Sequence, residues 1–196
     1  MKTRESGMPD EAMWRTFFDP EATLTALGLT RETGDVVDFG CGYGTFAIPA
    51  ARRIRRVLYG FDIEAAMIEE CTRLARQENL GNARFIRRDF VAEGTGLAAG
   101  SVNYAMLFNI LHAEHPLLLL AEAWRILAPS GRVAVIHWNY DPATPRGPSM
   151  AIRPRPEDCL HWLIEAGFAA DGGIIDLPPY HYGLVGRKGG EAWSLP

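Results

Sequence analysis

Three alternating glycines follow a short apolar run, and they constrain the fold more than any other feature of this sequence. The run covers residues 36–39, and the glycines are Gly40, Gly42 and Gly44. Glycine adopts backbone conformations that other residues avoid, and it lets a ligand approach the main chain closely. The amides of a helix that begins after Gly44 would face such a ligand. The segment therefore predicts a strand, a turn and a helix that bind a nucleotide-like cofactor.

The spacing of these glycines separates one cofactor class from another. The dinucleotide fingerprint is G-x-G-x-x-G, whereas here the third glycine comes one residue early and Thr45 takes the dinucleotide position. A nicotinamide-dependent oxidoreductase is therefore disfavoured. With Asp38 before the turn, the pattern D-x-G-x-G-x-G resembles motif I of the class I S-adenosylmethionine-dependent methyltransferases. The resemblance implies S-adenosyl-L-methionine as the cofactor and places these turn residues in its site: Asp38, Gly40, Cys41, Gly42 and Gly44.

Short β-branched or aromatic runs alternate with helical patterns from residue 34 onward, which indicates a parallel sheet covered by helices. We expect strands at residues 35–39, 57–61, 84–87, 102–108 and 132–138, helices at 64–78, 116–127 and 156–166, and two short strands within 173–188. The family resemblance implies an α/β fold, with a doubly wound, mostly parallel seven-stranded sheet, helices on both faces and a C-terminal antiparallel hairpin.

The length of 196 residues and the hydrophobic content of 47% predict one well-buried domain. Within this single methyltransferase-like domain (1–196) we expect an N-terminal helical cap (1–33), a cofactor-binding core (34–138), and an acceptor loop with the last helix and terminal hairpin (139–196). In the cap, Trp14, Phe17 and Phe18 are expected to pack on the sheet; a lid over the site is the alternative.

Acidic residues follow the second and third predicted strands. Asp62 can accept hydrogen bonds from both ribose hydroxyls of a nucleoside, or it caps the helix that begins near Glu64. Its neighbour Ile63 belongs to the same predicted cofactor site. Asp89 resembles the acidic residue of the family that receives the adenine amino group, and Phe90 would pack beside the base. For Asp89 the alternative is a plain surface carboxylate.

The fourth predicted strand ends at Asn109, whose backbone is expected to contact the methionine moiety. Asp38 would orient the ammonium of that moiety or tighten the glycine turn. His112 and His115 are candidate general bases, since imidazole takes up a proton near neutral pH. The alternatives are that His115 caps the next helix and that His112 only lines the pocket. Their H-x-x-H spacing lacks a third ligand, so no metal site is expected. Three histidines without a supporting constellation are expected to be structural: His137, His161 and His181.

The loop after the fifth predicted strand, residues 139–155, is expected to form a wall of the acceptor pocket. It carries Arg146, Arg153 and Arg155, which would hold a carboxylate or phosphate of the substrate or else remain solvated. The fourth strand does not continue into the D/N-P-P-Y/F motif of methyltransferases that act on exocyclic amino groups. We therefore expect a small-molecule methyl acceptor.

Net charge and cysteine content restrict the partners and the compartment. The formal charge of −4 and the pI near 5.7 provide no broad cationic field, so nucleic acid is not expected as a partner, although a local basic patch is possible. The three cysteines form no C-x-x-C pair, and the first residues lack the apolar region of a signal peptide. A cytoplasmic protein without membrane association is expected; its oligomeric state stays open.

Together these features predict methyl transfer to a small molecule by in-line displacement at the sulfonium methyl. The acceptor atom is not specified, because a base is needed only where that atom must lose a proton. A second hypothesis is a regulatory protein that binds S-adenosylmethionine or S-adenosylhomocysteine without turnover, since fold alone does not determine function. An aminopropyl transferase is disfavoured, because no paired carboxylates stand where a polyamine would bind.

Overall fold

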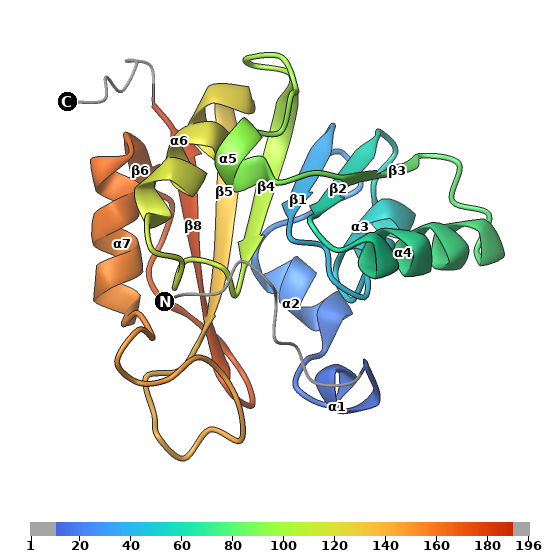
Figure 1. The fold of residues 1–196 in the computed structure, drawn as a ribbon. Coiled ribbons are helices and arrows are strands. Elements are labelled where there is room, and N and C mark those ends of the chain that lie inside the picture. Colours follow the sequence, from blue (N-terminus) through green and yellow to red (C-terminus); the bar gives the residue numbers. More distant parts are fainter. Residues whose placement is uncertain (1–10, 190–196) are drawn as a thin grey trace.

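The computed structural model describes residues 11–189, which form a mixed β-sheet between two layers of helices (Figure 1). The helices are α1 (Glu11–Arg15), α2 (Pro20–Ala26), α3 (Ala47–Arg53), α4 (Ala65–Gln77), α5 (Phe90–Glu93), α6 (Pro116–Ile126) and α7 (Pro156–Glu165). The strands are β1 (Val36–Phe39), β2 (Leu58–Asp62), β3 (Ala83–Arg87), β4 (Val102–Phe108), β5 (Leu127–Trp138), β6 (Phe168–Ala170), β7 (Ile175–Leu177) and β8 (His181–Lys188).

The order of the strands reverses beside β1. The order is β3-β2-β1-β4-β5-β8-β6, with β7 paired to β8. Strands β1 to β5 run parallel, and β8 runs antiparallel to β5. The chain moves outward from β1 to β3 and then returns to the other side of β1 with β4, so the strand order reverses between β1 and β4. Sheets of this kind bind ligands at the carboxyl ends of the strands where the order reverses. The predicted doubly wound, mostly parallel sheet is confirmed.

Two strand features differ from the expectation. The fifth strand begins at Leu127 rather than 132, because Leu127 pairs with Val102 before the register shifts. Strand β6 was not predicted: it has three residues, of which only Phe168 is buried, so it shows no alternating pattern. It pairs with β8 on the side opposite to β5. The predicted terminal hairpin is present as β7 and β8, with Pro178 and Pro179 in the turn.

Both faces of the central strands are buried, which explains why three of the four residues before the glycines, Val36, Val37 and Phe39, are apolar. All four residues of β1 are buried. Val36 belongs to the apolar cluster beneath α2 and α3, whereas Val37 belongs to the cluster beneath α6 and α7. Figure 1 shows these helix pairs on opposite faces of the sheet. Because helices cover the faces of such a sheet, its ends are the places left for chemistry.

The helices of residues 11–189 lack the length and apolar character needed to cross a membrane. The longest of the described helices, α4, has 13 residues, whereas a spanning helix needs about 20. The three cysteines, Cys41, Cys71 and Cys159, are free and buried. They are therefore part of the packed interior of the domain.

A buried hydrogen bond fastens α2 to the sheet: the hydroxyl of Tyr104 donates to the carbonyl of Leu27 at 2.8 Å. We expect Tyr104→Phe to lower the free energy of unfolding by about 1 kcal/mol, because the buried carbonyl loses its donor. Urea unfolding measures the change. Tyr140→Phe is the control, since Tyr140 is 36% exposed. Equal stability of Tyr104→Phe and the unaltered protein would contradict this role of the bond.

Candidate functional site

The glycine turn folds over the carboxyl end of β2. Gly40, Gly42 and Gly44 have φ values of 78°, 51° and 78°, in the left-handed region that favours glycine. The amides of Gly40 and Cys41 both donate to the carbonyl of Phe61 at 2.9 Å. The turn therefore requires its glycines for backbone conformation.

Asp62 ties this turn to β2. Its Oδ2 accepts a hydrogen bond from the Gly42 amide at 2.9 Å, and its Oδ1 accepts one from the Glu64 amide at 3.0 Å. Burial, as the largest cause, raises the pKa of the Asp62 carboxyl, and these amide bonds oppose that rise. The predicted cap near Glu64 thus exists, and it does not exclude ribose binding, because each carboxylate oxygen accepts more than one hydrogen bond.

Asp38 lies on β1 at 3% exposure. Burial, followed by the neighbouring charge of Asp62, raises the pKa of Asp38 from 3.8 to about 8. In the absence of a ligand the carboxyl therefore holds a proton at neutral pH. A cation placed beside it would favour the ionised form.

Polar atoms without partners lie at the reversal of strand order. Both polar atoms of the Asn109 side chain, and the hydroxyl of Thr45, are buried and find no hydrogen-bond partner within residues 11–189. Asn109 also has a φ of 56°, a conformation that non-glycine residues rarely adopt and that clusters at functional sites. A ligand with charged amino-acid groups would satisfy these atoms. The residues present therefore fit the methionine moiety of S-adenosylmethionine. The sequence predicted a ligand contact through the backbone of Asn109, but it did not predict a role for the side chains of Asn109 and Thr45.

The predicted adenine residues lie near the turn. The Phe90 ring packs edge-on against Phe39, with ring centroids 5.4 Å apart, and a Cβ placed on Gly40 would lie 4.0 Å from Phe90. Asp89 caps α5 by accepting a hydrogen bond from the Ala92 amide at 3.0 Å. The carbonyl of Ile63 accepts a hydrogen bond from Arg87. Phe90 thus stands beside the glycines, and the adenine contact of Asp89 stays a prediction.

The structure brings together two histidines that the sequence separates by a helix and a strand. Nδ1 of His112 lies 3.3 Å from Nε2 of His137. His137 is fully buried at the end of β5, and burial lowers its pKa well below the usual value; the positive charges of His112, His181 and Arg153 act in the same direction. His115 is exposed and begins α6, but its side chain makes no capping hydrogen bond. His112 is therefore the candidate base with a defined neighbour.

His181 packs with Phe17, Phe18 and Trp138 in a cluster of aromatic rings. The ring of His181 lies between Phe18 and Trp138, with centroids 4.3 and 4.2 Å away. Burial, then the charge of Arg153, lowers the pKa of His181 to about 3. Phe17 is 5% exposed and contacts Trp138 at 5.2 Å between centroids. Phe17 and Phe18 thus pack against the sheet end, as expected.

The loop over residues 139–155 is held by one of its own arginines. Arg153 donates to the carbonyls of Asn139 and Asp141 at 3.0 Å each, and to that of Pro148 at 2.9 Å. Arg155 instead stacks over Tyr140, 3.8 Å from the ring centroid. Of the two roles considered for Arg153, substrate anion binding and solvation, the structure shows neither, because its donors bind loop carbonyls and the hydroxyl of Thr144.

A glycine turn, a carboxylate at the end of β2 and unpaired polar atoms at the strand reversal are the features of a protein that binds a nucleoside cofactor at a doubly wound sheet. Residues 36–131 match the family described as "Methyltransferase domain". The chain belongs to the class I S-adenosylmethionine-dependent methyltransferase superfamily. The predicted family, and with it the enzyme class and the cofactor of that class, are confirmed.

Curated relatives share part of the chain. The 23S rRNA (uracil(1939)-C(5))-methyltransferase RlmD of Pseudomonas aeruginosa is 33% identical over 124 residues, which cover 61% of this chain and 26% of that protein. Aklanonic acid methyltransferase DauC of a Streptomyces species is 33% identical over 106 residues, which cover 52% of this chain and 47% of that protein. The chain thus spans about a quarter of the RlmD length, 26%.

Among solved structures, a SAM dependent methyltransferase from Aquifex aeolicus has a TM-score of 0.79 and 22% identity, covering 91% of this chain and 93% of that one. It shows the same fold.

One expectation is corrected. The sequence predicted a small-molecule acceptor and excluded nucleic acid as a partner. That exclusion was wrong, because RlmD proteins of several bacteria, named as 23S rRNA methyltransferases, match this chain. The exclusion used net charge, which sums over the whole surface and conceals local clusters.

The raised pKa of Asp38 predicts how stability depends on pH. Between about pH 4 and about 8 the folded protein keeps a proton on Asp38 that the unfolded chain releases. The free energy of unfolding therefore falls as pH rises through this window, by at most about 1.4 kcal/mol per pH unit from this group. Outside the window both states carry the same charge. Asp38→Asn should flatten the slope in urea unfolding, whereas Asp176→Asn, at an exposed position of β7, should not. An unchanged slope in Asp38→Asn would contradict the assignment.

Proposed function

We propose that this protein transfers a methyl group from S-adenosylmethionine to an acceptor by in-line displacement at the sulfonium methyl. The observation that carries the proposal is the Asp62 carboxylate, which bonds the Gly42 amide at 2.9 Å and the Glu64 amide at 3.0 Å. This places a fixed acceptor group at the carboxyl ends of β1 and β2, within reach of a nucleoside. Its remaining lone pairs suit the two ribose hydroxyls.

S-adenosylmethionine supplies an activated methyl group and a neutral thioether leaving group. The protein then has to align the acceptor and exclude water. We assign the ribose to Asp62, and the carboxylate and ammonium of the methionine moiety to Asn109, Thr45 and Asp38. The side-chain polar atoms of Asn109 and Thr45 are buried without a hydrogen-bond partner within residues 11–189. The Asp38 carboxyl is buried and has a raised pKa. Phe90 would pack beside the adenine, because it lies next to the glycine turn.

His112 is the proposed proton acceptor where the acceptor atom must lose a proton. Its neighbour His137 stays neutral near pH 7, because burial holds the pKa low. A neutral imidazole can accept a hydrogen bond, so we assign the contact as Nδ1–H of His112 donating to Nε2 of His137, which lie 3.3 Å apart. This tautomer makes Nε2 of His112 the nitrogen that takes up the proton. His137 would thus orient His112.

The names of the relatives include an RNA methyltransferase and aklanonic acid methyltransferase, so acceptor screening has to cover RNA as well as metabolites. Turnover distinguishes the enzyme from the regulatory protein of the second hypothesis: a regulatory protein would bind S-adenosylmethionine without forming S-adenosylhomocysteine with any acceptor.

The cysteine pattern supports a cytoplasmic location, which stays a prediction.

Asp62→Ala should weaken S-adenosylmethionine binding more than about tenfold, or about 1.4 kcal/mol, because the ribose loses its acceptor. Calorimetric titration with S-adenosylmethionine, S-adenosylhomocysteine and NADH measures this once any co-purified ligand has been removed. Asp176→Ala is the control on the surface. Because Asp62 also holds the turn, circular dichroism must show that the variant is folded. Binding of NADH alone would overturn the cofactor, and unchanged affinity in folded Asp62→Ala would overturn the ribose contact.

His112→Gln should raise the pKa of His137, because it removes the nearest of the positive charges that lower it. The pKa should stay below its usual value, since burial is the larger cause. NMR titration of the imidazoles tests this without an acceptor. His161→Gln is the control, because His161 lies on the exposed face of α7 and pairs with Glu165. A His137 that titrates at the ordinary value in the unaltered protein would contradict the arrangement. With an acceptor that loses a proton, His112→Gln should cut kcat about 100-fold.

A further inference from the structure

We propose that the face formed by α4 and the edge strand β3 binds single-stranded RNA through Arg76, Arg84 and Arg87. The inference deepens the proposed function, and it rests on that function only in taking the bound RNA to carry the methyl acceptor. Three features support it: the distribution of charge, the pattern of ion pairs, and the shape and chemistry of the groove beside β3.

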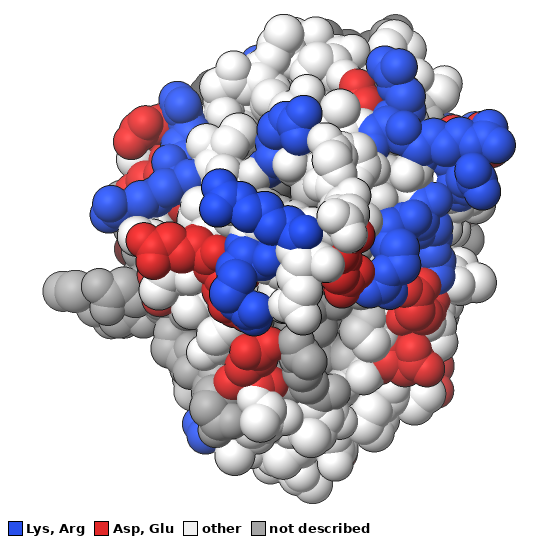
Figure 2. Space-filling model, turned by 90° about the vertical axis from the view of Figure 1, so that its right-hand side faces the viewer, with Lys and Arg blue, Asp and Glu red and all other residues white. Residues whose placement is uncertain are grey.

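Positive charge is concentrated in one stretch of this acidic chain. Residues 52–88 contain nine arginines and five acidic residues, although the whole chain has a net charge of −4. This stretch includes α4 and β3. Figure 2 shows the corresponding side of the molecule, where Lys and Arg side chains spread over the surface with acidic groups between them. A local cluster of this kind attracts a polyanion even when the net charge of the protein is negative.

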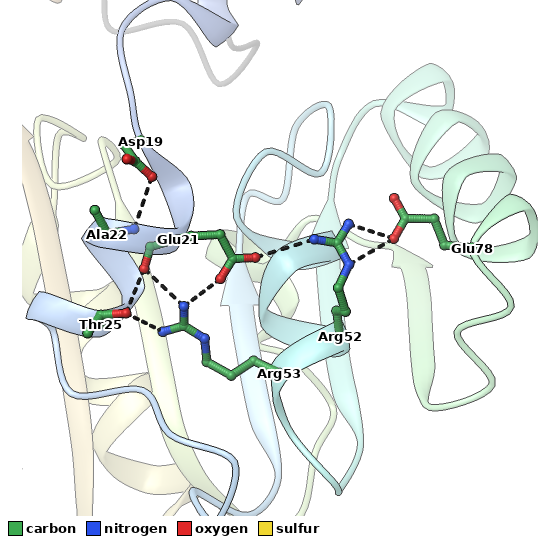
Figure 3. Close-up of polar contacts among 7 residues, drawn as sticks. All are labelled: Asp19, Glu21, Ala22, Thr25, Arg52, Arg53 and Glu78. Atoms are coloured by element: carbon green, nitrogen blue, oxygen red, sulfur yellow. Dashed lines mark hydrogen bonds and ion pairs between the residues drawn. The ribbon is translucent and has the colours of Figure 1, made fainter.

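Ion pairs determine which of these arginines keep their charge available. Figure 3 shows Arg52 held by Glu21 and Glu78, and Arg53 held by Glu21. Four further arginines pair with acidic side chains: Arg55 with Glu32, Arg56 with Asp35, Arg73 with Glu70 and Arg88 with Glu93. A carboxylate beside a guanidinium neutralises much of its field at the distance of a phosphate.

Arg76, Arg84 and Arg87 form no ion pair within residues 11–189. Nη1 of Arg84 donates to the carbonyls of Gly81 and Ala83 at 2.9 Å each, and Nε of Arg87 donates to the carbonyl of Ile63 at 3.1 Å. These bonds hold the side chains in place without cancelling their charge. The guanidinium groups keep further N–H donors in the geometry that suits phosphate oxygens.

An apolar groove adjoins these charges. It has a volume of about 890 Å³ and lies between α4 and β3, with Arg76 and Arg84 in its lining. Tyr59, Phe85 and Ile86 also line it, and Ile86 is 37% exposed. Unpaired bases stack on aromatic and apolar side chains while arginines follow the phosphates. In a duplex the bases are already stacked, so the groove favours a single strand.

Other occupants fit less well. A second copy would bring the same unpaired arginines against this face, and like charges would repel across a symmetric interface. An anionic membrane would match the charge but leave the groove between α4 and β3 without a role. A single-stranded polyanion with stacking bases uses both features.

Fluorescence anisotropy with a labelled oligouridine of about 20 nucleotides tests the proposal. For three phosphate contacts, the logarithm of the binding constant should fall with the logarithm of salt concentration with a slope of about −2. The combined variant Arg76→Gln, Arg84→Gln and Arg87→Gln should weaken binding about tenfold or more at low salt and remove most of the slope. The matched control is Arg55→Gln, Arg56→Gln and Arg73→Gln, which removes three paired arginines and should keep the affinity within about twofold.

Titration of S-adenosylmethionine on the same samples separates this inference from the proposed function. Intact cofactor binding without oligouridine binding overturns the RNA face alone, whereas absent cofactor binding overturns the proposed function. Equal losses in the two triple variants overturn the role of the unpaired arginines. Two further results overturn RNA as the occupant: binding only to phosphatidylserine vesicles, and a dimer in sedimentation that the first triple variant abolishes.

Discussion

The bond between the Asp62 carboxylate and the Gly42 amide is the contact on which the site depends. It connects the end of β2 to the turn after β1, which no strand pairing reaches, at 2.9 Å. The left-handed glycines allow the turn to bend, but they do not by themselves select one conformation. Burial, and then the charge of the same Asp62 carboxylate, raises the pKa of Asp38. A cofactor that binds Asp62 and Asp38 would therefore act on a pre-formed turn.

The fold places this contact at a sheet end because the faces are occupied. Val36 and Val37 point into opposite clusters, so β1 can present only its termini to solvent. Burial that stabilises the strand also desolvates Asp38, which follows those two residues. Desolvation then makes the ionised carboxyl costly until a cation arrives. At the neighbouring strand, the side-chain polar atoms of Asn109 are also buried without a partner among the described residues, which costs the free energy of their lost hydrogen bonds to water. The site thus holds unfavourable polar groups that a charged ligand would compensate.

Local patterns in the sequence predicted the glycine turn, the positions of Asp62 and Asp89, and most strands, because each depends on residues close in the chain. The contact between His112 and His137 could not be predicted this way, since it depends on how β5 lies beside the end of β4. His181 meets Trp138 only through the register of β8 on β5. The role of Arg153 was predicted wrongly for a similar reason: its partners are carbonyls and the Thr144 hydroxyl, whose positions depend on the folded loop. Strand β6 is too short to show periodicity.

Charge illustrates the same limit in another way. A formal charge of −4 is a sum, and it led to the exclusion of nucleic acid although nine arginines lie within residues 52–88. Which of those arginines remain unpaired depends on helix packing, because Glu21 reaches Arg52 and Arg53 only when α2 lies against α3. Folding thus divides the arginines into two sets. One set is neutralised by ion pairs, some of which connect neighbouring helices, and the other set keeps its charge beside β3. Arg87 belongs to the second set and also donates to the carbonyl of Ile63, next to Asp62. The charged edge and the proposed cofactor site therefore adjoin at the end of β2, so a single RNA strand bound along β3 would extend toward that proposed site.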